Sequence, residues 1–117
     1  MLDLIARHKH LIKSFHVLLY EKEGESFRFK AQFVFIDSSN LFIKEYLFEN
    51  KDRKYSYHWS DSSAALICRW DNANHWINIS TYPHHKHIGD DVLESIETSF
   101  EDVLSIISGK ISIKSSL

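Results

Sequence analysis

The sequence is poor in the residues that mark several protein classes. Cysteine and proline each occur once, and glycine occurs three times, in 117 residues. A single cysteine excludes an internal disulfide framework. Cys68 lies in the apolar run Ala-Leu-Ile-Cys, which predicts a buried and unreactive thiol. There is no internal repeat, linker or low-complexity segment, so the chain is expected to form one domain over residues 1–117.

Long apolar runs are also lacking. None approaches the roughly 18 residues that a membrane-spanning helix needs. The opening residues Met-Leu-Asp-Leu-Ile contain an acid and no basic flank, unlike a signal peptide. We therefore expect a cytoplasmic protein with no membrane partner.

The chain lacks a strong charge of either sign, with a formal net charge of −2. The charges are unevenly distributed along the sequence, however. Residues 1–87 hold 12 of the 14 basic side chains, 10 of the 16 acidic ones and all eight histidines, and the remainder is acidic. A mildly basic body permits binding to RNA, whereas a dedicated duplex-DNA binder would be far more basic.

What the chain does have is a high content of strand-forming side chains, with 44% hydrophobic and 14% aromatic residues. Residues 26–37 alternate apolar and polar side chains, a period typical of a half-buried strand. Short polar turns separate this segment from its neighbours, which predicts an antiparallel meander of about five strands. The expected strands are 14–21, 26–37, 41–48, 54–59 and 65–70.

Helices are expected at the two ends of the chain. Residues 1–10 can form a short helix. Near the C-terminus, Thr98 and Glu101 match a capping box, and an apolar stripe at helical spacing follows before Gly109, a residue that often ends helices. The sequence therefore predicts an α+β fold in which the C-terminal helix covers one face of the sheet.

Side chains that can take part in catalysis or metal binding are concentrated in residues 55–87, which hold five of the eight histidines. Alternation points Tyr57 inward with its aromatic neighbours and points His58 outward. On the next strand Arg69 and Asp71 share the face opposite Cys68. A polar patch on the outer face is predicted, although the register that would bring His58 opposite Arg69 is not fixed by sequence.

The segment Pro-His-His-Lys-His at 83–87 admits two chemistries. Two positioned imidazoles can act as general base and acid while a cation stabilises phosphorane-like charge, which suffices for RNA cleavage without a metal. Alternatively, the His-x-His pair His85 and His87 is a common ligand set for zinc or another divalent metal.

The candidate residues follow from these two chemistries. Acid–base candidates are His84, His85 and His87, with His58 and Tyr57 as secondary candidates. Substrate contacts are Arg69, Lys86, Asp71 and His75. Glu45, which shares a face with Leu41 and Ile43, is either a buried functional carboxylate or an edge residue.

The ordered motifs Tyr-Ser-Tyr-His-Trp at 55–59, Arg-Trp-Asp-Asn-Ala-Asn-His at 69–75 and Pro-His-His-Lys-His at 83–87 resemble the TumE family of toxin–antitoxin proteins. The resemblance covers about residues 26–108 and includes the strand at 41–46 and the final helix. Within it, Asn74 replaces a frequent proline and Trp76 replaces a frequent second histidine.

The resemblance implies a small toxin that a helix-turn-helix antitoxin neutralises by direct binding. It assigns no catalytic residues. Three activities remain open on the residues themselves: a metal-independent ribonuclease without a cofactor, a non-enzymatic module that docks on a protein target, and a histidine-ligated metal-dependent hydrolase. A free sheet edge would invite homodimerisation or pairing with the antitoxin.

Overall fold

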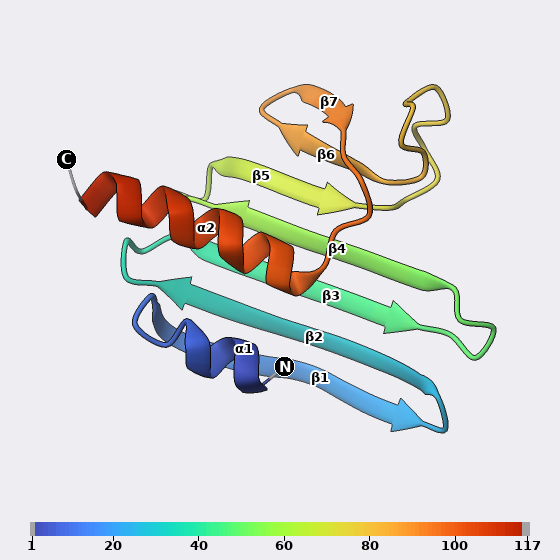
Figure 1. Ribbon diagram of the computed structural model, residues 1–117, viewed down its shortest axis with the longest axis horizontal. Coiled ribbons are helices and arrows are strands. Elements are labelled where there is room, and N and C mark those ends of the chain that lie inside the picture. Colours follow the sequence, from blue (N-terminus) through green and yellow to red (C-terminus); the bar gives the residue numbers. More distant parts are fainter. Residues whose placement is uncertain (1, 116–117) are drawn as a thin grey trace.

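The computed structural model describes residues 2–115 and consists of one antiparallel sheet with a helix at each end of the chain (Figure 1). Seven strands follow one another in the order of the sequence, and each pairs with the next. The elements are α1 (Leu2–Arg7), β1 (Ile12–Glu23), β2 (Ser26–Phe35), β3 (Asn40–Leu47), β4 (Arg53–Ser60), β5 (Leu66–Asp71), β6 (His85–Ile88), β7 (Asp91–Glu94) and α2 (Phe100–Ser115). The predicted α+β meander with a covering C-terminal helix is confirmed.

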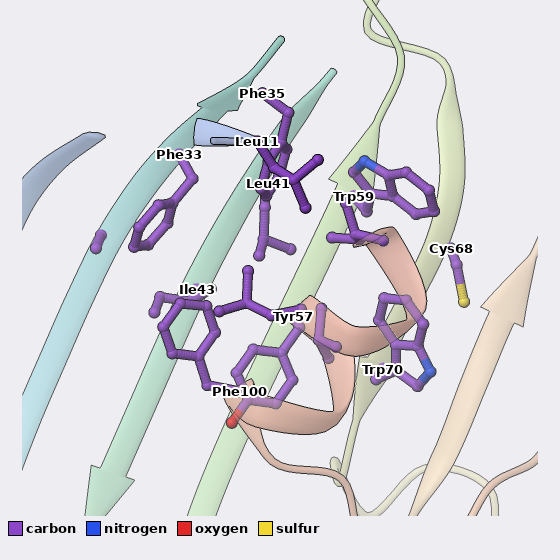
Figure 2. Packing of buried hydrophobic residues seen from close by; sticks show 14 of the residues in the cluster. Leu11, Phe33, Phe35, Leu41, Ile43, Tyr57, Trp59, Cys68, Trp70 and Phe100 are labelled. Carbon is purple, nitrogen blue, oxygen red and sulfur yellow. The ribbon is translucent and has the colours of Figure 1, made fainter. Parts of the chain in front are cut away.

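The core lies between one face of the sheet and α2 (Figures 1 and 2). Alternate residues of β2 to β5 point toward the helix. Four buried aliphatic side chains of the helix and Phe100 pack against them. The inward positions predicted for Tyr57, Trp59 and Cys68 are confirmed. Burial raises the pKa of the Cys68 thiol to about 11, as expected for an inert thiol.

Helix α2 begins and ends later than the sequence predicts. Its capping residue is Ser99, whose hydroxyl accepts a hydrogen bond from the Asp102 amide at 3.2 Å while Asp102 Oδ2 accepts one from the Ser99 amide at 2.9 Å. The capping box is therefore one residue further along than Thr98. Gly109 does not end the helix, because the next turn buries Ile111 against the core, which offsets the cost of about 1 kcal/mol for a helical glycine.

The hairpin β6–β7 lies beyond the five strands that the sequence predicts. Its strands have four residues each, and His-Lys-His-Ile carries little strand propensity. The turn is made by Gly89, whose φ of 58° suits glycine. Pairing with β5 and β7 forms the strand where the local sequence does not. Strand β6 places the last three residues of the Pro-His-His-Lys-His segment on the sheet.

β1 is one edge of this sheet, and part of its apolar surface faces solvent. Phe15, Val17 and Tyr20 pair with core-facing residues of β2 yet are 40%, 53% and 65% exposed, respectively. Ile5 of α1 lines the open pocket above them. None of the described helices is long and apolar enough to cross a membrane.

Candidate functional site

Three residues converge on the sheet face opposite α2. Asp71 ends β5, and His85 and His87 lie on the paired strand β6, where Asp71 is opposite His85 and Arg69 is opposite His87. Asp71 Oδ1 lies 2.9 Å from His85 Nε2, and its Oδ2 lies 3.4 Å from His87 Nε2. We refer to Asp71, His85 and His87 as the Asp–His cluster.

The Asp71 carboxylate is held by its own strand and the turn that follows. The amide of Ala73 donates a hydrogen bond to Oδ1 at 3.0 Å, and Arg69 Nε donates one to Oδ2 at 3.1 Å. The side chain is only 7% exposed, whereas that of Arg69 is 42% exposed. Arg69 therefore both neutralises the buried acid and remains accessible to a ligand.

His85 is the most buried member of the cluster. Its Nδ1 lies 2.9 Å from the Pro83 carbonyl oxygen. Because a carbonyl can only accept, Nδ1 must carry a proton. Within the described residues its Nε2 has no hydrogen-bond partner, although it lies close to Asp71. A side chain that is 1% exposed cannot exchange protons directly with an RNA substrate.

His87 and His58 are the accessible imidazoles of this face. The register places His58 opposite Arg69 on β4, so His58, Arg69 and His87 form a row across three strands. Burial and the Arg69 charge lower the pKa of His58. Burial also lowers the pKa of His87, with Asp71 acting in the opposite direction. Both shifts favour the neutral form of the ring.

Trp76 covers one side of the Asp–His cluster. Its ring meets the rings of His85 and His87 edge to face, with centroids 6.4 Å and 6.1 Å apart. The loop that carries Trp76 runs between β5 and β6, and Asn72 anchors its start through hydrogen bonds to the backbone of Arg53 and Tyr55. This packing fixes the two imidazoles against each other and against Asp71.

A second polar group lies on the helix side of the same sheet. The Tyr57 hydroxyl donates a hydrogen bond to Glu45 and accepts one from Arg53 at 2.7 Å, and Arg53 Nη2 lies 3.6 Å from the Glu45 carboxylate. Burial and the Glu45 charge raise the pKa of Tyr57. Every member has a partner, and the Glu45 side chain is only 14% exposed, so Glu45 is a largely buried carboxylate with a structural environment. We refer to these three residues as the tyrosine network.

The structure brings together five of the nine candidate residues on the outer face: His58, Arg69, Asp71, His85 and His87. The other four lie elsewhere. His84 stacks on Tyr55 and hydrogen-bonds its hydroxyl at 3.0 Å, Lys86 is opposite Trp70, and Tyr57 points into the core. His75 is exposed and lines an open pocket beside Lys54.

The sequence alone did not identify the basic groove that lies beside this row. Lys30 of β2 is opposite Lys44 of β3, and both line an open groove with Phe42, Ser56, His58 and Arg69. The groove has a volume of about 310 Å³ and no acidic residue in its lining. The polar face of residues 26–37 was the available signal, but only the register shows which cations it joins.

The Asp–His cluster is also a set of potential metal ligands. One ligand atom from each of its three residues lies within 4.8 Å of the other two. Two imidazoles and a carboxylate form a donor set typical of zinc and related divalent transition metals.

Comparison with known proteins gives a family match. A family model described as Toxin TumE matches residues 1–111. The chain belongs to the TumE toxin family. The match begins earlier than the resemblance seen in the motifs and includes α1 and β1. Neither curated proteins nor solved structures gave a significant match. Membership of a toxin family implies an antitoxin partner.

Proposed function

We propose that this TumE protein acts in the cytoplasm as a toxin that binds RNA on its outer sheet face and cleaves it without a metal cofactor. The observation that carries the proposal is the row His58, Arg69 and His87 on adjacent strands. It sets an accessible guanidinium between two imidazoles. That order suits a phosphodiester held at Arg69 with a proton acceptor on one side and a proton donor on the other.

The groove beside the row supports a nucleic-acid substrate. Lys30, Lys44 and Arg69 supply positive charge for backbone phosphates, and Phe42 is an exposed aromatic ring among them. Tyr46, further along β3, lies beneath the Lys44 ammonium at 4.9 Å from the ring centroid. Cations interleaved with aromatic rings on a sheet suit single-stranded RNA, whose unstacked bases can stack while its phosphates pair with the cations.

The chemical step needs only groups of this chain. A neutral imidazole of the row removes the proton from the ribose 2′-hydroxyl, whose oxygen attacks the adjacent phosphorus. Arg69 stabilises the charge on the phosphoryl oxygens. The other imidazole, in its protonated form, donates a proton to the departing 5′-oxygen. In this scheme Asp71 accepts a hydrogen bond from His87 Nε2 and orients the ring, and the Ala73 amide and Arg69 Nε hold Asp71 in place.

RNA cleavage by untagged protein in the presence of a chelator tests the proposal. We expect the wild-type protein to degrade single-stranded RNA, and His87→Asn, His58→Asn and Arg69→Gln each to lose at least about 100-fold in rate. These side chains are partly exposed, so melting temperatures should change little. His16→Asn, on exposed β1, is the matched control and should retain full activity.

Growth inhibition in cells provides the second readout. The variants that lose RNA cleavage should also lose toxicity, and His16→Asn should stay toxic. A protein that inhibits growth but leaves RNA intact would contradict the ribonuclease proposal and favour toxicity by docking on a protein target. Full toxicity of His87→Asn would contradict the assigned row.

We further propose that the antitoxin is a helix-turn-helix protein that binds this chain directly. The free edge of β1, with its exposed apolar side chains, supports a protein partner on that side of the molecule. Co-expression with the product of the neighbouring gene should yield a stable complex and restore growth. Homodimerisation through β1 is the competing use of this edge, and light scattering of the isolated protein measures it.

A further inference from the structure

We propose that the Asp–His cluster is a binding site for one divalent transition-metal ion of the zinc class, held by Asp71, His85 and His87. The ligand atoms come from two paired strands of a sheet, so their positions are set by backbone pairing. A tetrahedral ion with bonds of about 2.0–2.1 Å holds its ligand atoms roughly 3.3 Å apart. Asp71 Oδ1 lies 2.9 Å from His85 Nε2 and Oδ2 lies 3.4 Å from His87 Nε2, and one ligand atom from each residue lies within 4.8 Å of the other two. A small adjustment of the side chains therefore brings the three ligands to the spacing that such an ion needs.

The protonation of His85 is the strongest support. Its Nδ1 donates to the Pro83 carbonyl, so a neutral His85 carries its lone pair on Nε2. That lone pair lies 2.9 Å from a carboxylate oxygen and has no hydrogen-bond partner among the described residues. Either a proton on Nε2 or a metal ion shared by the nitrogen and the carboxylate removes this repulsion, and the neighbouring His87 Nε2 supplies the second nitrogen that a metal ion needs. A hydrogen bond from the far ring nitrogen to a carbonyl is also the usual support of a metal-bound histidine.

The surroundings select the kind of ion. Two imidazole nitrogens and one carboxylate favour Zn²⁺, Co²⁺, Ni²⁺ or Cu²⁺ over Mg²⁺ and Ca²⁺, which prefer oxygen ligands. The Arg69 guanidinium, 3.1 Å from Asp71 Oδ2, opposes any cation there. Glu94, opposite His85 on β7, contributes negative charge on the same face. Arg69 therefore competes with the ion for the Asp71 carboxylate, which weakens the site without blocking it.

The consequence for activity rests on the proposed ribonuclease function. An ion bound at His87 Nε2 displaces the proton from this nitrogen to Nδ1. The ring then has no free lone pair with which to accept a proton from RNA. Metal binding should therefore inhibit cleavage, and a chelator should reverse the inhibition.

Binding is tested on untagged protein that has been treated with a chelator and dialysed. Titration with Zn²⁺ in a calorimeter and with Co²⁺ by visible absorption should give one ion per chain. His87→Asn and Asp71→Asn should weaken binding at least about tenfold, and Arg69→Gln should tighten it severalfold because a competing cation is removed. His75→Asn and His16→Asn, which alter exposed histidines, should bind as the wild type does.

Several outcomes would overturn the site. These are no binding, binding that His87→Asn and Asp71→Asn leave unchanged, or an Arg69→Gln variant that binds no better than the wild type. His87 is suited to the test because its side chain is 24% exposed, so its replacement should preserve the fold. Nitrogen-15 shifts of the His85 ring give a readout independent of activity, since Nε2 should respond to zinc while Nδ1 stays protonated.

RNA cleavage measured on the same samples separates this proposal from the previous one. Zinc binding with the expected variant pattern but no RNA cleavage supports the site and overturns the ribonuclease. Cleavage that zinc stimulates also supports the site, and it overturns the metal-free mechanism in favour of a metal-dependent hydrolase. RNA cleavage without zinc binding supports the ribonuclease and overturns the site.

Discussion

The two faces of the sheet carry polar groups of similar composition that differ in how completely their buried atoms are hydrogen-bonded. The tyrosine network on the helix side and the Asp–His cluster on the outer side each place one carboxylate among hydrogen-bonding side chains and an arginine. In the tyrosine network, every polar atom at its centre has a partner. In the Asp–His cluster, His85 Nε2 lies 2.9 Å from Asp71 Oδ1 but makes no hydrogen bond in the part of the chain that is described.

This difference separates a structural group from a site. Buried polar groups are satisfied in stable proteins, because an unmade hydrogen bond costs about 1–3 kcal/mol. Two buried side-chain atoms of the described residues lack a hydrogen bond, Trp59 Nε1 in the core and His85 Nε2. Because His85 Nε2 also lies beside a carboxylate and an accessible imidazole, it points to a ligand or a reaction. The tyrosine network instead joins β3 and β4 beneath the start of α2, where Arg53 also lies 3.3 Å from Glu97. We expect its loss to affect folding, and loss of the Asp–His cluster to affect function.

Replacement of Glu45 should give the largest change in stability. Glu45→Ala leaves the Tyr57 hydroxyl without its acceptor and Arg53 without its largely buried counter-charge, and should lower the free energy of unfolding by about 1–3 kcal/mol. Chemical denaturation measures this loss. Glu21→Ala, which removes an exposed ion pair with Arg28, is the matched control and should cost less than about 1 kcal/mol.

The same variant also tests the functional side of the comparison. RNA cleavage per folded molecule should be unchanged in Glu45→Ala. A loss of cleavage by a folded Glu45→Ala protein would place the reaction on the helix side of the sheet and contradict the proposed row on the outer face.

The sequence predicts the first five strands because their alternation is long and their turns are polar. The same alternation predicts the outward direction of His58, Arg69 and Asp71. It cannot predict the neighbours of these residues, because register depends on pairing across the sheet. Asp71 meets His85 only through β6, a four-residue strand that its own sequence does not favour. The motif at 83–87 thus identified the histidines, and the fold selected two of them.

Residue 76, where the chain departs from the family motif, lies beside the Asp–His cluster. Trp76 contacts both imidazoles of the cluster. Trp76→His should add a further nitrogen ligand beside them and tighten zinc binding about tenfold, a change of roughly 1.4 kcal/mol. Trp76→Phe keeps an aromatic ring without a ligand and should not tighten binding. Equal affinity of the two variants would show that residue 76 does not reach the ion.

The dependence of stability on pH gives the smallest but most direct contrast between the two faces. The folded pKa of His58 lies below its ordinary value of 6.5, so the unfolded chain binds more protons as pH falls below about 6.5 and stability decreases. The folded pKa of Tyr57 lies above its ordinary value of 10.0. Above pH 10 the unfolded chain therefore loses a proton that the folded chain keeps, and stability decreases again.

Each limb of this profile should respond to one variant. His58→Asn should flatten the acid limb in part, since the pKa of His87 is also lowered, and should leave the alkaline limb intact. Tyr57→Phe should flatten the alkaline limb in part, since burial also raises the pKa of Tyr55, and should leave the acid limb intact. Free energies of unfolding from denaturant titrations between pH 5 and 11 measure both limbs. If either variant changed both limbs equally, the two faces would be electrostatically coupled through the sheet, and assigning stability to one face and chemistry to the other would fail.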